Sequence, residues 1–170
     1  LGGRFLGKVL YGDLAALISI LGIVGIIQMI FGLTVVKFIS SAKAKEQVNF
    51  SRWVYWWSLW AGGAIVLILL IISPLVANFL NLSKPSVIYL LAPTAALYLI
   101  TTAGRSILQG FLRFKDYVLS MLSESIIKNF LALGLGLLGY GIWGLTGALF
   151  LGVAASFIFT HFRLSGIVGG

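Results

Sequence analysis

The chain consists of long apolar segments separated by short polar ones. A helix needs about 20 apolar residues to cross the roughly 30 Å hydrocarbon layer of a bilayer, and each apolar segment reaches that length. None shows the apolar–polar alternation of a membrane barrel strand. The pattern therefore predicts an all-α integral membrane protein with five transmembrane helices, over residues 14–38, 53–80, 86–112, 117–139 and 142–162.

Prolines and small residues predict the shape of these helices. Pro74 and Pro93 lie inside predicted spans, where each removes a backbone hydrogen bond and favours a kink. Gly144, Ala148 and Gly152 recur every four residues on the last helix, a spacing that lets two helix backbones approach closely. We expect the last helix to pack tightly through this ladder.

The basic residues predict an orientation. Seven of them fall on one side of the predicted helices and three on the other, and the richer side is normally cytoplasmic. This places the loop predicted over residues 40–52 and the C-terminus in the cytoplasm. The two groups are Lys37, Lys43, Lys45, Arg52, Arg113, Lys115 and Arg163 against Arg4, Lys8 and Lys84.

Composition excludes several classes of protein. The 170 residues are 60% hydrophobic and 9% charged, which is too little polar surface for a soluble enzyme or a disordered tail. There is no cysteine, and one histidine with four carboxylates leaves little for a metal centre or an acid–base pair. We therefore predict no catalytic residues, no metal and no cofactor. The net charge of +8 lies beside apolar segments, so we interpret it as contact with lipid headgroups rather than with nucleic acid.

Three ionisable residues fall inside predicted spans: Arg105, Glu124 and Lys128. A charge at the centre of a bilayer costs about 2.5–3.5 kcal/mol on insertion scales, so such residues are usually paired or face water. Arg105 and Glu124 lie equally far from the turn near residue 114, roughly 14 Å along antiparallel helices at 1.5 Å per residue. Lys128 follows Glu124 by one turn, on the same face. We expect the three side chains to form one group.

This group has two interpretations. It is either a buried ion pair that fixes the packing of two helices, or a cationic patch that lines a water-filled cavity and attracts an anionic headgroup. One carboxylate between two cations leaves a net charge of +1, which is hard to sustain in a dry core. We therefore favour the second interpretation and name Arg105, Lys128 and Glu124 as substrate-binding candidates.

Three stretches resemble a known family. Arg4-Phe5-Leu6-Gly7 with Tyr11-Gly12 resembles its R-x-L-G-x-x-x-Y-G segment. Residues 104–110, followed by Arg113-Phe114, resemble its R-[GS]-I-L-Q-G-x-x-R-F run, and residues 123–128 resemble the start of its next helix. The family is that of the polysaccharide-biosynthesis flippases, the Wzx-type lipid-linked oligosaccharide translocases of the multidrug/oligosaccharidyl-lipid/polysaccharide exporter superfamily. Lys8-Val9-Leu10 departs from it, because the family usually has proline and acidic residues there.

The resemblance implies a function and an architecture. Family members move an undecaprenyl-diphosphate-linked or similar glycan across the cytoplasmic membrane, by alternating access of two lobes around a cationic cavity, and most are not enzymes. They have a dozen or more helices, so the five predicted here would be the second to sixth helices of an N-terminal lobe. The implied partners are an anionic lipid-linked glycan, the lipid bilayer and a second lobe of the same polypeptide.

Other functions compete with this one. A peptidoglycan-precursor flippase of the same superfamily would share the fold and the cationic cavity. A multidrug or cation antiporter would need an acidic cavity, whereas Glu124 is outnumbered by cations. A membrane-embedded glycosyl- or acyltransferase would need paired carboxylates or a His–acid site, and a membrane scaffold that transports nothing is the remaining class.

Overall fold

The computed structural model describes residues 22, 25–26, 28–79 and 85–168. The motif at residues 4–12, the basic residues Lys8 and Lys84 and most of the first half of the predicted span 14–38 lie outside these ranges. All described elements are helices and turns, and this part of the chain contains no strand.

Five long helices and two short ones follow one another along the described chain. A helix over Gln28–Ser41 comes first, and the others are α2 (Ala44–Ile71), α3 (Ser73–Phe79), the 3₁₀ turn η1 (Pro85–Val87), α4 (Ile88–Gly110), α5 (Phe114–Leu137) and α6 (Gly141–Val168). Three of them, α2, α5 and α6, are long and apolar enough to cross a membrane. The prediction of an all-α membrane protein is confirmed.

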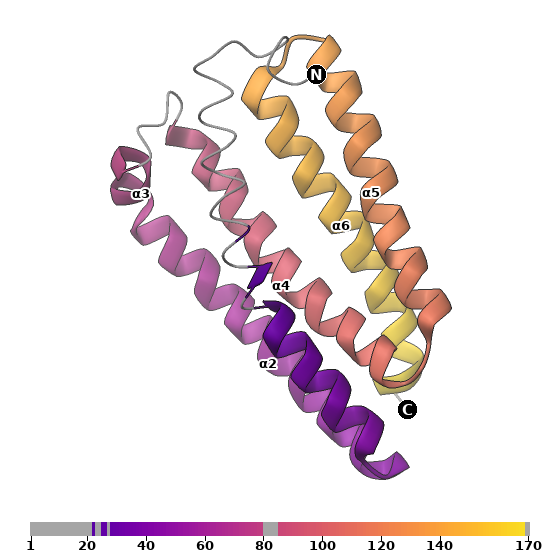
Figure 1. Cartoon of the computed structure of the whole chain (residues 1–170). Coiled ribbons are helices and arrows are strands. Elements are labelled where there is room, and N and C mark those ends of the chain that lie inside the picture. Colours follow the sequence, from indigo (N-terminus) through magenta and orange to yellow (C-terminus); the bar gives the residue numbers. More distant parts are fainter. Residues whose placement is uncertain (1–21, 23–24, 27, 80–84, 169–170) are drawn as a thin grey trace.

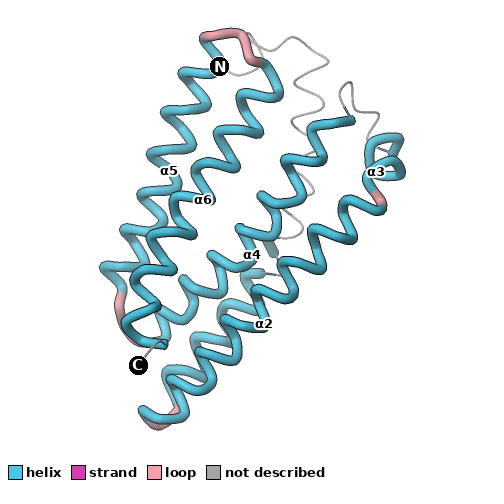
Figure 2. Tube along the Cα trace, turned by 180° about the vertical axis from the view of Figure 1, so that it is seen from behind, coloured by secondary structure: helices cyan, strands magenta, loops and turns pink. Residues whose placement is uncertain are grey.

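The helix α4 lies in the middle of the assembly. It packs against α2 on one side and against α6 on the other, while α5 runs antiparallel along α6 (Figures 1 and 2). The main core cluster joins the Gln28–Ser41 helix, α2, α4 and α6 through buried aliphatic side chains, which are Val35, Ile39, Val54, Ala103, Ile107, Leu108 and Leu164. This order places the C-terminal half of α4 beside three other helices.

Small residues allow the close helix crossings. A Cβ added at Gly152 on α6 would lie 2.8 Å from the Lys128 Cβ and 3.1 Å from the Glu124 backbone oxygen, so only glycine fits where α6 crosses α5. Gly144 and Ala148 are buried on the same face. The predicted Gly144–Ala148–Gly152 packing ladder is therefore confirmed.

The start of α2 corrects the predicted loop over residues 40–52. Only Ala42 and Lys43 interrupt the helical chain, because α2 already begins at Ala44. The Lys43 backbone N–H donates to the Glu46 carboxylate at 3.4 Å, which satisfies one free donor at the start of the helix. Hydropathy marks where a helix enters hydrocarbon rather than where it begins. The 28 residues of α2 span about 42 Å, the thickness of a bilayer with its headgroup layers.

The two prolines act differently. Pro93 lies inside α4, which continues through it. Near Pro74 the long span predicted over residues 53–80 divides, because α2 ends at Ile71 and α3 begins at Ser73 and runs in a different direction (Figure 1). Proline has no N–H for the carbonyl four residues earlier, here that of Leu70, which explains the break.

The two hairpin turns between α4, α5 and α6 share one hydrogen-bond pattern. After α4, the Arg113 N–H donates to the Leu108 oxygen at 2.9 Å, and after α5 the Tyr140 N–H donates to the Leu135 oxygen at 3.1 Å. This is the Schellman motif, whose penultimate residue has a positive φ. Gly139 takes that position after α5 with a φ of 81°, but Leu112 takes it after α4 with a φ of 59°.

Candidate functional site

The three charged residues predicted inside spans meet in the structure. Arg105 comes from the C-terminal third of α4, and Glu124 and Lys128 lie one turn apart on α5. The Arg105 Nη2 lies 2.7 Å from the Glu124 Oε2, and the Lys128 Nζ lies 3.7 Å from the Glu124 Oε1. Glu124 thus has a cation on each carboxylate oxygen, as the hairpin geometry predicts.

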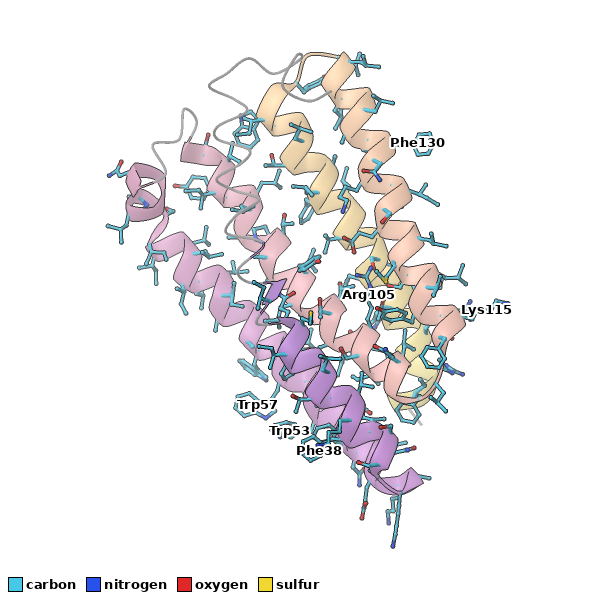
Figure 3. All side chains as sticks on the ribbon, viewed as in Figure 1. Phe38, Trp53, Trp57, Arg105, Lys115 and Phe130 are labelled. Atoms are coloured by element: carbon cyan, nitrogen blue, oxygen red, sulfur yellow. The ribbon has the colours of Figure 1, made fainter. Side chains whose placement is uncertain are left out.

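Arg105 is held by more than the carboxylate. Its Nε donates to the Ser120 Oγ at 3.0 Å, and its Nη2 donates to the Ser120 backbone oxygen at 3.0 Å and to the Ser156 Oγ at 2.6 Å. Ser120 Oγ also contacts the hydroxyls of Ser156 and Thr160, both at 2.8 Å. The guanidinium therefore joins α4, α5 and α6 in one buried hydrogen-bond network. Figure 3 labels the position of Arg105.

The two cations differ in exposure. The side chains of Arg105 and Glu124 are 11% and 9% exposed, whereas that of Lys128 is 32% exposed. An exposed ammonium is able to exchange its partner for a ligand, while a buried guanidinium with several hydrogen bonds is fixed in place. Arg105 is accordingly fixed among its partners, and Lys128 is the cation that faces open space.

That open space is a cavity of about 530 Å³. One wall carries polar side chains from α4 and α5, and the other is apolar and comes largely from α6. The lining residues described are Gly22, Gly25, Thr94, Tyr98, Glu124, Lys128, Asn129, Ala132, Leu145, Leu149 and Val153. Arg105 is not among them. Along one side the cavity has one ammonium, one amide and two hydroxyls, beside the Glu124 carboxylate that is paired with Arg105. This set is suited to an anion with polar substituents.

The three hydroxyl residues around Arg105 were not predicted from the sequence. A signal for them exists: Ser120 precedes Glu124 by four residues on α5, while Ser156 and Thr160 continue the four-residue spacing of the Gly144–Ala148–Gly152 ladder. Hydroxyl side chains on the faces of two helices that pack together are positioned to bond across the interface.

Other polar groups gather at the end of the bundle near the α4–α5 turn. Asp116 lies 3.3 Å from the Arg163 Nε and 4.0 Å from the Arg113 Nη1, and all three are at least partly exposed. The Tyr55 hydroxyl is 2.7 Å from the His161 Nδ1, which links α2 to α6. Within the described ranges, no three His, Asp or Glu side chains are grouped closely enough to hold a metal ion.

Comparison with known proteins identifies the family. The model of a family described as polysaccharide biosynthesis protein matches residues 1–163. No curated protein and no solved structure gives a significant match. Because the family match covers nearly the whole chain and the helices suit a membrane, the chain belongs to the polysaccharide biosynthesis protein family, whose members are flippase-type membrane transporters rather than enzymes.

Proposed function

We propose that the chain is part of a flippase that moves a polyprenyl-diphosphate-linked oligosaccharide across the cytoplasmic membrane for cell-surface polysaccharide synthesis. The observation that carries this proposal is the cavity beside α5, where Lys128 is partly exposed and Glu124 is already paired with Arg105. The group has a net charge of +1, so it attracts an anion such as a diphosphate.

The residues divide the work of binding. Lys128 contacts the diphosphate directly, since its ammonium borders the cavity and lies 3.7 Å from its present carboxylate partner. Asn129 and Tyr98 offer donors to sugar hydroxyls or to further phosphate oxygens, and the Thr94 hydroxyl, which donates to the Leu90 oxygen, offers an acceptor. Arg105 acts as a positioning residue: it fixes the Glu124 carboxylate, which in turn positions the Lys128 ammonium. Arg105 does not line the cavity itself.

Transport requires the cavity to open to each side of the membrane in turn. A second lobe of the same polypeptide faces this one in the proposed transporter, and alternating access between the two lobes exposes the anion site. The basic residues near the Ala42–Lys43 link and the α4–α5 turn favour a cytoplasmic location for that end of the bundle and for the C-terminus. The chain transports its lipid-linked substrate unchanged and performs no catalysis.

A Lys128→Ala variant tests the proposal in the complete polypeptide that carries this chain. Loss of one charge-assisted contact of about 1.5–3 kcal/mol corresponds to a decrease of roughly 10- to 100-fold in substrate affinity. We expect surface glycan in a flippase-deficient strain to fall accordingly, at equal membrane expression. Lys115→Ala is the matched control, because Lys115 is exposed near the α4–α5 turn and does not line the cavity (Figure 3). Full complementation by Lys128→Ala would contradict the proposed role of the cavity.

A further inference from the structure

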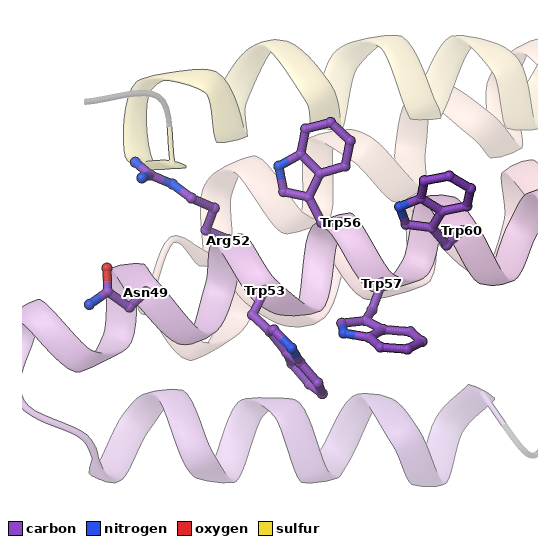
Figure 4. Close-up of a pocket in the computed structure, with 6 residues that line it drawn as sticks. All are labelled: Asn49, Arg52, Trp53, Trp56, Trp57 and Trp60. Carbon is purple, nitrogen blue, oxygen red and sulfur yellow. The ribbon is translucent and has the colours of Figure 1, made fainter.

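The outer surface of α2 carries an aromatic groove that the proposed transport site does not use. It has a volume of about 720 Å³ and is lined by Asn49, Arg52, Trp53, Trp56, Trp57 and Trp60 (Figure 4). All four tryptophans are exposed, from 56% for Trp53 to 73% for Trp60. A volume in this range is ordinary for a small-molecule site.

The groove lies away from the buried side of α2, although Trp53 stacks on Phe50, which contacts Phe38 of the Gln28–Ser41 helix. Lys45, Asn49, Arg52, Trp56 and Trp60 follow one another at steps of three and four residues and so form one stripe along the helix. The buried residues Ser51, Val54, Ser58 and Gly62 form a second stripe, on the opposite side. Because α2 is long and apolar enough to span a membrane, lipid is the neighbour that suits the first stripe.

The length of the stripe distinguishes it from an ordinary aromatic belt. Tryptophans of a belt sit at the level of the headgroups. From Arg52 to Trp60 the helix rises about 12 Å, which is most of the roughly 15 Å hydrocarbon depth of a single leaflet. With Arg52 at headgroup level, Trp60 lies near the middle of the bilayer. A headgroup belt does not account for its exposure there.

The charge of the stripe changes along its length. Lys45 and Arg52 are exposed at the polar end, and indole rings alone line the deeper part. In Figure 4, Arg52, Trp56 and Trp60 project from one side of α2, and Trp53 and Trp57 from the other, so the groove runs between two rows of side chains. An occupant with an anionic head and a single extended apolar chain matches this distribution.

We propose that this groove binds one anionic phospholipid of the leaflet at the basic end of α2. The phosphate lies at Arg52, with Lys45 adding positive charge, and one acyl chain extends past Trp53 and Trp56 to Trp60. Each basic residue near an anionic membrane surface contributes about a fivefold preference for anionic lipid. The site is separate from the cavity beside Lys128, because that cavity is lined largely by residues of α4, α5 and α6.

Brominated lipids test this proposal, since bromine quenches tryptophan fluorescence on contact. The full chain, with Trp143→Phe to remove the tryptophan at the start of α6, is placed in bilayers that contain a small fraction of brominated phosphatidylglycerol or of brominated phosphatidylcholine. We expect phosphatidylglycerol to quench at about five times lower mole fraction. Bromine near mid-chain is expected to quench most, and Trp60→Leu is expected to remove that part of the signal.

Variants at basic residues identify the cause of the preference. Arg52→Gln is expected to lower the preference about fivefold, and Arg52→Lys to retain most of it, which also controls for correct folding. Arg113→Gln is the matched control, because Arg113 is an exposed basic residue beside the α4–α5 turn and outside the groove. Equal quenching by the two lipids, or equal loss of preference in Arg52→Gln and Arg113→Gln, would overturn the proposal. Weak quenching that rises when the protein is diluted in lipid would also overturn the proposal. It would mean that a second copy of the chain covers the groove at high protein concentration and leaves it on dilution.

Discussion

The helices α4 and α2 differ in how apolar and how buried they are. In α4, 15 of 23 residues are buried, although it carries Arg105 and is not among the helices apolar enough to be recognised as spans. In α2, four of 28 residues are buried, although its apolar residues suit a membrane span. The more apolar helix is thus the less buried one. In a membrane protein, lipid covers the large apolar side chains, while small and polar residues mark the protein interior.

The largest effect is expected when Arg105, the buried cation of α4, is removed. In Arg105→Ala, Glu124 loses its 2.7 Å partner, and Ser120 and Ser156 lose a donor. Breaking a buried pair typically costs about 3–5 kcal/mol. We expect the free energy of unfolding, measured by denaturant titration in mixed micelles, to fall by that amount. The double variant Arg105→Ala/Glu124→Ala is expected to recover part of the loss, because no buried charge is left uncompensated.

A control for this variant lies on the same hairpin. Arg113 is exposed and lies 4.0 Å from Asp116, and exposed ion pairs contribute at most about 1 kcal/mol. Arg113→Ala should therefore leave stability nearly unchanged. If Arg105→Ala were as stable as Arg113→Ala and still failed in transport, Arg105 would be a substrate ligand rather than a residue that fixes the helix packing.

Two neighbouring glycines of α2 provide a smaller test. A Cβ at Gly62 would lie 3.0 Å from the Ile100 Cδ1 on α4, whereas a Cβ at Gly63 would meet nothing within 4 Å. Gly62→Leu overfills the α2–α4 contact, and we expect it to cost about 1–3 kcal/mol in the free energy of unfolding. Gly63→Leu faces outward and should be neutral or slightly stabilising, because leucine is the better helix former. Equal effects in the two variants would mean that α2 does not pack on α4 through this face.

The smallest effect is expected at the Ala42–Lys43 link. The Gln47 side-chain Nε2 donates to the Ile39 backbone oxygen at 2.8 Å, so the start of α2 caps the end of the Gln28–Ser41 helix. Gln47→Ala should lower the free energy of unfolding by about 1 kcal/mol. Lys45→Ala, two residues away and exposed, is the control. An unchanged stability in Gln47→Ala would show that water replaces this bond at no cost.

The sequence predicted part of this structure because two of its signals are physically strong. Apolar length located the helices, and equal distances from a tight turn brought Arg105 and Glu124 together. It did not predict that Arg105 is enclosed by Ser120, Ser156 and Thr160. A membrane helix has apolar residues on both its lipid-facing and its packed face, so the pattern that reveals the buried side of a soluble helix is weak. Hydropathy also placed the start of α2 too late, since a helix continues through the polar headgroup layer.

The contact between Arg105 and Glu124 has a consequence for how the chain enters the membrane during synthesis. Inserting an arginine at the centre of a membrane helix through the translocon costs about 2.5–3.5 kcal/mol. The helix α4 leaves the ribosome before Glu124, which neutralises Arg105. Three residues, Phe111–Arg113, connect α4 to α5 along the chain. Glu124 follows Arg105 by 19 residues and is the first acid that is able to pair with it inside the membrane. The two helices are therefore expected to leave the translocon as one hairpin, with α4 stably inserted only once α5 has been made.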